Sequence, residues 1–432
     1  MTDVLVLGAG VAGLTAARAL SRAGVSVCVV EGRDRIGGRV HSIRDFCERP
    51  VEAGAEFVHG SGAATWPELR AHGLETRPCH VARHTMLSVG GRARWIPWTL
   101  ADPRLWPSLA IFPALSRFKP PDCSAREFIE RRGFRGPARV MAEMTLCAHL
   151  PGSTDEIGME GLLEDGLLVL ESGLNHRVVA GYDALPNRIA RDLDIRLHFA
   201  VTAIHWAEDG VSVQAMDGRE LTARAAICTL PVGVLESNAV TFVPELPESK
   251  RTALRNLEMG PVLKLLLRFE ESFWPAWAAT IACGTGPVTL YWPVFHGIPG
   301  APPVLTAYCT GPRAMRLASV SEEEAVDTVL ADLRRLFPKS DPGARLVASR
   351  RIDWSSDPFA CGGYTFVRPG GKGARARLRA ADTGSLFWAG SATEWSPIAA
   401  TVEAAYASGL RAAGEAAALL ARHPARRTAE AS

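Results

Sequence analysis

The chain has 432 residues, which is too long for one compact core and suits two domains of ordinary size. Its composition, 47% hydrophobic and 22% charged, is that of a folded globular protein and excludes a disordered chain. The formal net charge of +2 creates no general field for nucleic acid or an anionic membrane, so neither is expected as a partner.

Nine cysteines are scattered along the chain without a Cys-x-x-Cys pair. Such an odd, unpaired set indicates reduced thiols in a cytoplasmic protein and argues against a disulfide framework. No signal peptide precedes the first apolar run, and no apolar stretch reaches the ~18 residues that a membrane-spanning helix needs. We therefore expect a cytoplasmic protein with no membrane anchor, and no metal site is predicted.

The N-terminal segment combines a strand, a glycine-rich turn and a helix. An apolar run over Val4–Leu7 leads directly into Gly8-Ala9-Gly10-Val11-Ala12-Gly13. Glycines at this spacing permit a tight turn, close approach of the backbone to a pyrophosphate and close packing of helix on strand. A second apolar run ends at Glu31, eighteen residues after Gly13, where a carboxylate can bind ribose hydroxyls. These features predict a dinucleotide-binding βαβ unit, but the pattern alone does not separate NAD from FAD.

The residues after Glu31 favour FAD. They read Gly32-Arg33-Asp34-Arg35-Ile36-Gly37-Gly38-Arg39, and with Glu31 they resemble the E-x-R-x-R-x-G-G-R run of the flavin amine oxidase family. In that family the arginines and paired glycines continue around the FAD diphosphate. The resemblance therefore implies FAD as the cofactor.

Two segments follow whose patterns are less regular. Val51–Gly60 mixes small, apolar and ionisable residues and is expected to be a strand beneath a cofactor. Residues 95–121 are rich in tryptophan and proline, so long regular elements are expected to be interrupted there. This second segment is either a packed lobe of loops and short helices or a lid over the substrate, and the sequence does not decide between them.

A β pattern begins at Ile195 and is expected to form a meander that ends at Thr229-Leu230-Pro231. Apolar strands are expected again at 262–269 and 288–295. The acidic first turn of Ser321–Phe337 predicts a surface helix, because carboxylates suit the positive end of the helix dipole.

The last helix is expected from about Val402 to Leu420, with Ala and Gly on a closely packed face. No second G-x-G-x-x-G is found, so a second nucleotide site for NAD(P)H is not expected. The electrons must therefore come from the substrate.

The C-terminal segment carries a second resemblance. Residues 386–393 read Leu-Phe-Trp-Ala-Gly-Ser-Ala-Thr and residues 401–409 read Thr-Val-Glu-Ala-Ala-Tyr-Ala-Ser-Gly. They are similar to the closing signature of the flavin amine oxidases, F-x-A-G-E-A-T followed by G-T-V-x-G-A-x-x-S-G. With the N-terminal match and the segments around Lys264 and Trp354, the resemblance spans the whole chain. The chain is thereby identified as a member of the monoamine and polyamine oxidase superfamily, similar to its bacterial members.

Membership implies an α/β fold in which a Rossmann-like FAD-binding domain of the GR2 type is interleaved with an α+β substrate-binding domain. The FAD-binding segments are expected at 1–84, 191–262 and 385–432. The substrate-binding segments are expected at 85–190 and 263–384.

The resemblance also implies which residues meet the cofactor. The N-terminus of the last helix, at Thr401 and Val402, is expected to face the N1–C2 carbonyl edge of the flavin, where negative charge develops on reduction. Val201 matches the position whose backbone meets the adenine end. The expected FAD contacts are Gly8, Gly10, Ala12, Gly13, Glu31, Arg33, Gly38, Arg39, Gly54, Ala55, Val201, Trp354, Gly390, Ser391, Thr401 and Val402.

Lys264, His59 and Glu56 are expected close to the reacting atoms, together with Tyr364. The family places a lysine at 264, linked through water to flavin N5, where it assists reoxidation and imine hydrolysis; the alternative is a strand-edge lysine that reaches solvent. His59 matches a polyamine oxidase position near the flavin, and its alternative is a hydrogen-bonded core histidine. Glu56 holds a substrate cation or satisfies cofactor-side donors. Both Glu56 and His59 can line the site only if the strand bends between them.

Tyr364 resembles one aromatic wall of the amine-binding cage. The residue before it is Gly363, where monoamine oxidases attach the flavin through a cysteine, and Cys361 lies three positions from Tyr364, so non-covalent FAD is expected. The second cage tyrosine maps to Thr401, and the glutamate of the closing signature maps to Ser391. The cage is therefore expected to be one-sided.

The leading hypothesis is an FAD-dependent amine oxidase. Hydride passes from the carbon beside the nitrogen to flavin N5, the imine or iminium is released or hydrolysed, and O2 regenerates FAD with H2O2. The alternative is a tailoring oxidase of secondary metabolism that acts on an amine or amide of a larger biosynthetic intermediate. An L-amino-acid oxidase has less support, because no arginine is assigned to a substrate carboxylate, and a flavoprotein that serves only as a binding module stays open. The expected partners are a small-molecule amine or amide and O2, while a homodimer and the identity of the substrate stay open.

Overall fold

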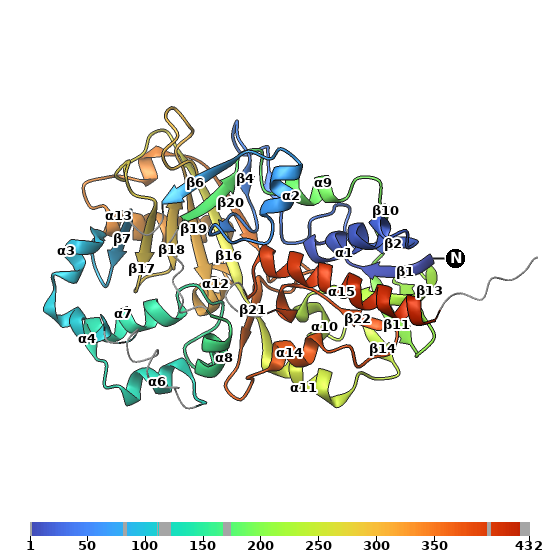
Figure 1. Ribbon diagram of the computed structural model, residues 1–432. Helices are drawn as coiled ribbons and strands as arrows, with labels where there is room; N and C mark the ends of the chain where they lie inside the picture. Colours follow the sequence, from blue (N-terminus) through green and yellow to red (C-terminus); the bar gives the residue numbers. More distant parts are fainter. Residues whose placement is uncertain are drawn as a thin grey trace, which may run out of the picture.

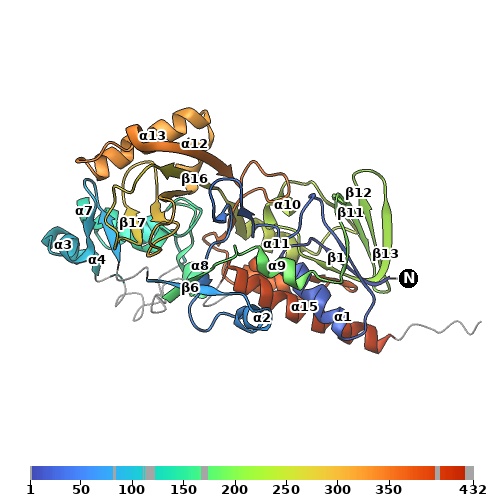
Figure 2. The same ribbon diagram turned by 90° about the horizontal axis from the view of Figure 1, so that it is seen from above.

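The computed structural model describes residues 2–80, 84–109, 111, 122–166, 174–394 and 399–423. Two sheets lie beside each other, each with helices against it (Figure 1). The last helix, α15 (Val402–Arg422), runs beside the first, α1 (Val11–Arg22), in both views (Figure 2). Its N-terminal end points to the centre of the molecule, between the two sheets (Figure 1). Ends of chain that are far apart in sequence therefore form one packed unit.

The first sheet contains the predicted βαβ unit. Strand β1 (Thr2–Leu7) lies between β2 (Val27–Val30) and β13 (Glu220–Cys228), and both pair with it in parallel. Strand β22 (Leu386–Trp388) pairs in parallel with β13. The strands of this parallel core read as continuous apolar runs because helices or other elements cover both faces. The predicted Rossmann-like unit is confirmed.

The meander is confirmed over part of its predicted length. Strands β11 (Val201–Trp206), β12 (Val211–Ala215) and β13 pair in antiparallel order. The prediction that the meander begins at Ile195 is wrong, because β10 (Asp194–Arg196) pairs in parallel with β2. The chain turns between β10 and β11 at His198, which has a φ of 53° and so leaves the strand conformation.

The second sheet has seven strands in the order β20-β16-β19-β18-β17-β7-β8. Strand β16 (Val262–Phe269), second in this order, is buried along most of its length between β19 (Val304–Thr310) and the edge strand β20 (Leu346–Asp353). The predicted strand at 262–269 is confirmed, and the one at 288–295 is shorter, as β18 (Leu290–Pro293). The remaining strands are β17 (Thr280–Cys283), β7 (Thr85–Ser88) and β8 (Arg94–Trp95).

Helix α13 (Glu322–Leu336) confirms the predicted surface helix. The Ser321 hydroxyl caps it by accepting a hydrogen bond from the Glu324 amide, and three glutamates occupy its first turn. Its apolar face packs with α12 (Gly311–Ala318) against one face of the second sheet.

Val51–Gly60 does not form the single strand that we predicted. It contains two short strands, β4 (Val51–Glu52) and β5 (Val58–His59), with an irregular segment between them. The backbone is irregular here because the carbonyls of Glu52 and Gly54 turn to the Lys264 ammonium, and the Ala55 amide donates to the Arg39 carbonyl. The bend that Glu56 and His59 require is thus present.

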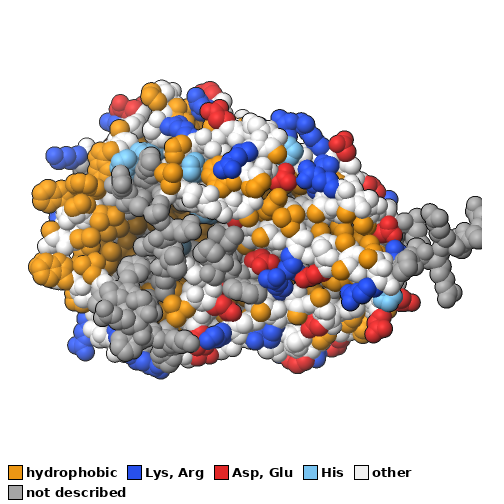
Figure 3. Space-filling view, in the orientation of Figure 1, with side chains coloured by type: hydrophobic (Ala, Val, Ile, Leu, Met, Phe, Trp, Pro, Cys, Tyr) orange, Lys and Arg blue, Asp and Glu red, His pale blue; other side chains and the backbone are white. Residues whose placement is uncertain are grey.

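The tryptophan- and proline-rich segment consists of short elements, as predicted: α3 (Ile96–Leu100), a 3-10 turn over Pro103–Leu105, and α4 (Trp106–Leu109). Figure 3 shows hydrophobic side chains gathered over this part of the surface, where Trp98 and Trp106 are exposed. The question of a lid also involves residues 110 and 112–121, which lie outside the described residues.

Shorter elements complete the described structure. They are β3 (Ser42–Ile43), α2 (Trp66–Ala71), β6 (Thr76–His80), α6 (Ala125–Arg131), α7 (Gly136–Cys147), α8 (Met159–Glu164), β9 (Leu174–Val178), α9 (Ala184–Ile189), α10 (Val232–Glu236), β14 (Thr241–Val243), α11 (Glu248–Asn256), β15 (Leu257–Gly260), β21 (Tyr364–Val367), α14 (Ala374–Arg379) and two 3-10 turns at Gly343–Arg345 and Ser391–Thr393. Within the part of the chain that the structure describes, no helix is both long and apolar enough to cross a membrane. The division into five domain segments stays a prediction.

The contact between α1 and α15 depends on one glycine, which allows a matched test within a single helix. A Cβ on Gly409 would lie 2.3 Å from the Ala12 carbonyl oxygen, whereas a Cβ on Gly414 would meet nothing within 4 Å. We expect Gly409→Ala to destabilise the protein by about 1–3 kcal/mol, because the helices must separate. Gly414→Ala should stabilise it by about 0.5–1 kcal/mol through the helix propensity of alanine. Denaturant unfolding measures both, and a Gly409→Ala variant as stable as Gly414→Ala would contradict the assigned packing.

Candidate functional site

The turn between β1 and α1 is shaped for a ligand that approaches the backbone. Gly8 has a φ of +108°, and a Cβ on Gly13 would lie 2.0 Å from the Gly8 carbonyl oxygen. A Cβ on Gly10, at the N-cap, would meet nothing within 4 Å. Helix α1 has neither a side-chain cap nor an acidic residue in its first turn. Its first amides are therefore available to an anion.

Glu31 lies buried at the end of β2, on the same side of the sheet as this turn. Its carboxylate accepts hydrogen bonds from the amides of Ala9 (2.9 Å) and Arg33 (3.0 Å). The Phe199 amide donates to the Glu31 carbonyl, so the chain leading into Val201 lies beside this carboxylate. The geometry keeps Glu31 close to the glycine turn, where a ribose contact would be made.

The Arg33 guanidinium is engaged with protein groups. It forms an ion pair with Asp357 at 2.8 Å and lies 5.4 Å above the centre of the Phe359 ring. No sequence pattern links Arg33 to Asp357, which lies 324 residues later in the chain. A contact of Arg33 with FAD stays a prediction.

Arg39 is a partly buried cation without a carboxylate partner. Its Nη1 donates to the Gly363 carbonyl oxygen at 2.7 Å, and no ion pair joins it to any acidic residue that the structure describes. Burial, together with the nearby Arg33, lowers the pKa of Arg39 to about 10, so the group stays charged at neutral pH. A cation that no carboxylate of the described chain neutralises favours an anionic ligand beside it.

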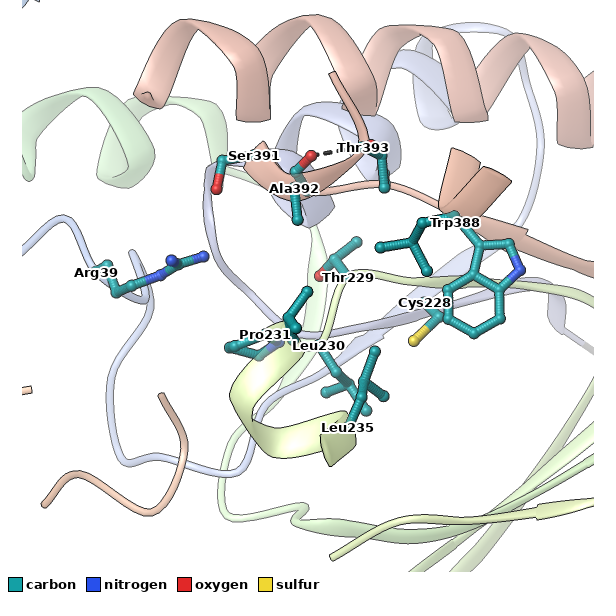
Figure 4. A pocket seen from close by; sticks show the side chains of 14 residues that line it. Arg39, Cys228, Thr229, Leu230, Pro231, Leu235, Trp388, Ser391, Ala392 and Thr393 are labelled. Atoms are coloured by element: carbon teal, nitrogen blue, oxygen red, sulfur yellow. Dashed lines mark hydrogen bonds between the residues drawn. The ribbon is translucent and has the colours of Figure 1, made fainter. Parts of the chain in front are cut away.

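Arg39 lines a hollow with residues of the C-terminal segment. The Arg39 guanidinium and the Ser391 hydroxyl point into the same space (Figure 4). A Cβ on Gly390, whose φ is +131°, would meet nothing within 4 Å. The other lining residues include Thr229, Trp388 and Thr393. A cation, open glycines and a helix N-terminus are the groups that a dinucleotide diphosphate requires, so the residues fit FAD.

The N-terminus of α15 lies at the centre of the molecule, and its first turn is buried. The Thr401 hydroxyl caps it by accepting a hydrogen bond from the Ala404 amide at 3.3 Å. The Glu403 carboxylate accepts a hydrogen bond from the His59 backbone amide at 3.2 Å. The Nδ1 atom of the His59 ring lies 3.3 Å from the Asn175 side-chain oxygen. His59 is therefore held by protein contacts next to this helix end.

Lys264 is held inside the protein by direct contacts. Its side chain is 4% exposed, and its Nζ lies 3.0 Å from the Glu52 carbonyl oxygen, 2.7 Å from the Gly54 carbonyl oxygen and 3.3 Å from Glu56 Oε2. An ammonium has three N–H donors, so these acceptors use all of them. The alternative of a strand-edge lysine that reaches solvent is wrong. The link through water to flavin N5 stays a prediction.

Glu56 is surrounded by protein donors. Its carboxylate accepts the Trp292 indole N–H at 3.0 Å and the Arg177 Nε–H at 2.9 Å, in addition to the Lys264 contact. The side chain is 3% exposed. Glu56 is thus shared by two cations of the chain itself, and the two roles expected from sequence stay predictions. Sequence reasoning missed Arg177 because it comes from a strand far along the chain.

Aromatic side chains continue from this cluster to Tyr364. The ring centroids of Phe57 and Trp292 are 5.8 Å apart, and those of Trp292 and Tyr308 are 5.2 Å apart. The Tyr308 hydroxyl donates to the Tyr364 hydroxyl at 3.0 Å, and Tyr364 donates to the His149 carbonyl oxygen. We call Phe57, Trp292, Tyr308 and Tyr364 the aromatic wall.

The sequence predicted only Tyr364 of this wall. Tyr308 stands directly opposite Lys264 in the pairing of β16 with β19. Burial raises the pKa of Tyr364 to about 12 and holds the pKa of Tyr308 well above its ordinary value, so both hydroxyls are neutral. Tyr308 and Tyr364 are partly exposed, and the neighbouring His149 is exposed. This end of the aromatic wall is therefore accessible to a ligand.

Comparison with known proteins identifies the family. The model of the flavin-containing amine oxidoreductases matches residues 11–417. The chain belongs to this family. It is 30% identical over 442 residues to "Polyamine oxidase 4" of Oryza sativa subsp. japonica, an alignment that covers 96% of this chain and 88% of the relative. It is also 30% identical over 402 residues to "Probable polyamine oxidase 4" of Arabidopsis thaliana, covering 84% and 77%.

Solved structures show the same fold. Cyclohexylamine oxidase from Brevibacterium oxydans IH-35A superposes with a TM-score of 0.81 at 21% identity, covering 98% of this chain and 100% of that one. Wild-type putrescine oxidase bound to putrescine superposes with a TM-score of 0.80 at 23% identity, covering 96% and 99%. The predicted family and fold are confirmed: the chain is a flavin-dependent amine oxidase that acts on C–N bonds.

Arg39 offers a test of the diphosphate assignment. Arg39→Met removes the positive charge but keeps a long side chain, and we expect it to weaken FAD binding at least about tenfold, equivalent to ~1.4 kcal/mol. The control is Arg224→Met, because Arg224 forms its ion pair with Asp3, away from the glycine turn. Flavin absorbance per protein after dialysis, followed by titration with FAD, measures the effect. Equal retention in the two variants would remove Arg39 from the cofactor site.

Proposed function

We propose that this chain oxidises an amine with non-covalently bound FAD and passes the electrons to O2. The observation that carries the cofactor part is the Arg39 guanidinium, which lines a hollow together with Gly390 and Ser391 and forms no ion pair with a carboxylate of the described residues. FAD, when bound, accepts a hydride from the carbon next to the amine nitrogen and returns to its oxidised form with O2, releasing H2O2.

The chain's own residues would hold that cofactor by its charges and hydroxyls. Glu31 would accept hydrogen bonds from the ribose hydroxyls. The first amides of α1, together with Arg39, would bind the diphosphate. The N-terminus of α15, capped by Thr401, would place its positive end where negative charge develops. Val402 and Ser391 would line the same region.

The aromatic wall would receive the amine. Because the pKa of Tyr364 is about 12, its hydroxyl and that of Tyr308 stay neutral and can orient a nitrogen by hydrogen bonding. Trp292 and Phe57 would cover the apolar part of the substrate and exclude water. This arrangement supports oxidation of an amine whose nitrogen is neutral when it reacts.

Non-covalent attachment is supported by the packing at Gly363. A Cβ at this position would lie 2.2 Å from Val262 Cγ2, so the Val262 side chain leaves no room for a cysteine there. The thiol of Cys361 contacts the Pro358 carbonyl oxygen instead. The nine cysteines are all free thiols. We therefore include a reducing, cytoplasmic location in the proposal. The comparisons do not favour the alternative of a secondary-metabolite tailoring oxidase.

Acid precipitation tests the mode of attachment. We expect it to release all of the flavin into the supernatant, because no covalent bond holds it. Absorbance of the supernatant and the washed pellet measures the distribution, with a protein that carries covalent flavin as the positive control. Flavin that stays with the pellet is the contradicting result.

Lys264→Met tests the role of the buried ammonium in reoxidation. The variant keeps a long apolar side chain but loses the positive charge that favours electron transfer to oxygen. We expect reoxidation of the reduced enzyme by O2 to slow at least about tenfold, or ~1.4 kcal/mol of barrier. Stopped-flow mixing of anaerobically reduced enzyme with O2 measures the step. The control is Lys339→Met, because Lys339 is exposed. Equal reoxidation rates in the wild type and both variants would exclude a role for Lys264 in this step.

A further inference from the structure

The charges beside the aromatic wall are unusual for a site that receives an ammonium. Glu56 is the carboxylate in contact with the wall, through the indole N–H of Trp292. Two cations contact the same carboxylate, Arg177 at 2.9 Å and Lys264 at 3.3 Å. Arg177 also lies 4.8 Å above the centre of the Phe57 ring, and Lys264 lies 5.5 Å from the centre of the Trp292 ring. Cations therefore exceed carboxylates among the described groups that touch this wall.

The two other carboxylates nearby are turned away from it. Glu52 accepts hydrogen bonds from the Ser42 hydroxyl and the Tyr182 amide, both at 2.8 Å, and burial raises its pKa to about 7. Glu403 is fully buried beneath the His59 amide, at the positive end of α15. No hydrogen bond of the described structure joins either carboxylate to the aromatic wall.

These contacts determine how unfavourable it is to bind a substrate that carries a second ammonium group. Such a group would meet Arg177 and Lys264, and Glu56 is already neutralised by both. Burying a charge without a partner, next to like charges, is strongly unfavourable. An alkyl or aryl group in the same place would instead bury apolar surface against Phe57 and Trp292, which is favourable by about 25 cal/mol per Å².

We propose that this enzyme takes a monoamine with an apolar alkyl or aryl group and discriminates against diamines and polyamines, with Arg177 as a specificity-determining residue. The inference rests on the proposed amine oxidation at this site. It separates the chain from plant relatives that are polyamine oxidases by name. Arg177 acts by occupying Glu56, which would otherwise be free to pair with the far ammonium of a diamine.

A matched pair of substrates tests the proposal. n-Hexylamine and cadaverine have the same number of non-hydrogen atoms and differ in a terminal methyl group against a terminal ammonium. Flavin-loaded enzyme is mixed anaerobically with each amine at one pH, and flavin bleaching gives a limiting rate and an apparent Kd. We expect the ratio of rate to Kd to favour n-hexylamine at least about tenfold, mostly through Kd.

Arg177→Gln should reduce the preference for n-hexylamine over cadaverine at least about fivefold, since the substitution frees Glu56 to pair with the second ammonium. Arg44→Gln is the control, because Arg44 is 53% exposed and pairs with Asp183, and it should leave the ratio between the two amines unchanged. Bound flavin and the unfolding midpoint of each variant establish that the fold is intact.

Three results would overturn the inference. A wild-type enzyme that reacts equally well with cadaverine lacks the proposed discrimination. An Arg177→Gln variant with an unchanged ratio removes Arg177 from specificity while leaving amine oxidation in place. If neither amine, nor benzylamine, bleaches the flavin of the loaded wild-type enzyme, the proposed function fails together with this inference.

Discussion

The buried ammonium of Lys264 connects the two halves of the molecule. It projects from the buried strand β16 of the second sheet and is held by the carbonyl oxygens of Glu52 and Gly54 and by the carboxylate of Glu56. A charge in this position needs several strong acceptors, because desolvation alone would be prohibitive. The segment after β4 therefore gives up its strand geometry to supply them. Its irregular path brings Phe57 against Trp292. It also brings Glu56 to Lys264 and Arg177, and His59 to Asn175.

The cofactor half depends on a different constraint, the close approach of backbone to backbone. Gly13 and Gly409 allow the first strand, the first helix and the last helix to pack within distances that a side chain would forbid. The hollow is lined by Arg39, by the C-terminal Gly390 and Ser391, and by Thr229, whose hydroxyl donates to the Gly8 carbonyl oxygen of the glycine turn at 3.3 Å. The N-terminus of α15 lies at the centre of the molecule, between the two sheets (Figure 1). A redox cofactor and its substrate would meet at this junction.

Local patterns were sufficient to predict the parts of the site that lie close together in sequence. The spacing from Val4 to Glu31 defines the βαβ unit, and the apolar neighbours of Lys264 indicate its burial. The failures have a common cause. The path of Val51–Gly60 depends on a lysine more than two hundred residues later, and Arg177 reaches Glu56 from a strand 121 residues away. Tyr308 could be placed only after the register of β16 and β19 was known.

The pairing of β10 with β2 is a similar case. Its alternating sequence suited the meander that follows it, and only tertiary pairing assigns it to the parallel sheet. Sequence alone therefore predicted the family, the nucleotide turn and single residues of the site. The arrangement of charges that decides what the site can accept required the three-dimensional contacts.

A high-resolution crystal structure of the flavin-loaded enzyme would test whether Glu56 is shared by Lys264 and Arg177 beside the aromatic wall. We expect direct contacts from Lys264 Nζ to the carbonyl oxygens of Glu52 and Gly54 and to Glu56, with Arg177 on the other carboxylate oxygen. A structure in which Arg177 lies away from Glu56, or in which Lys264 turns from these carbonyl groups into solvent, would contradict it.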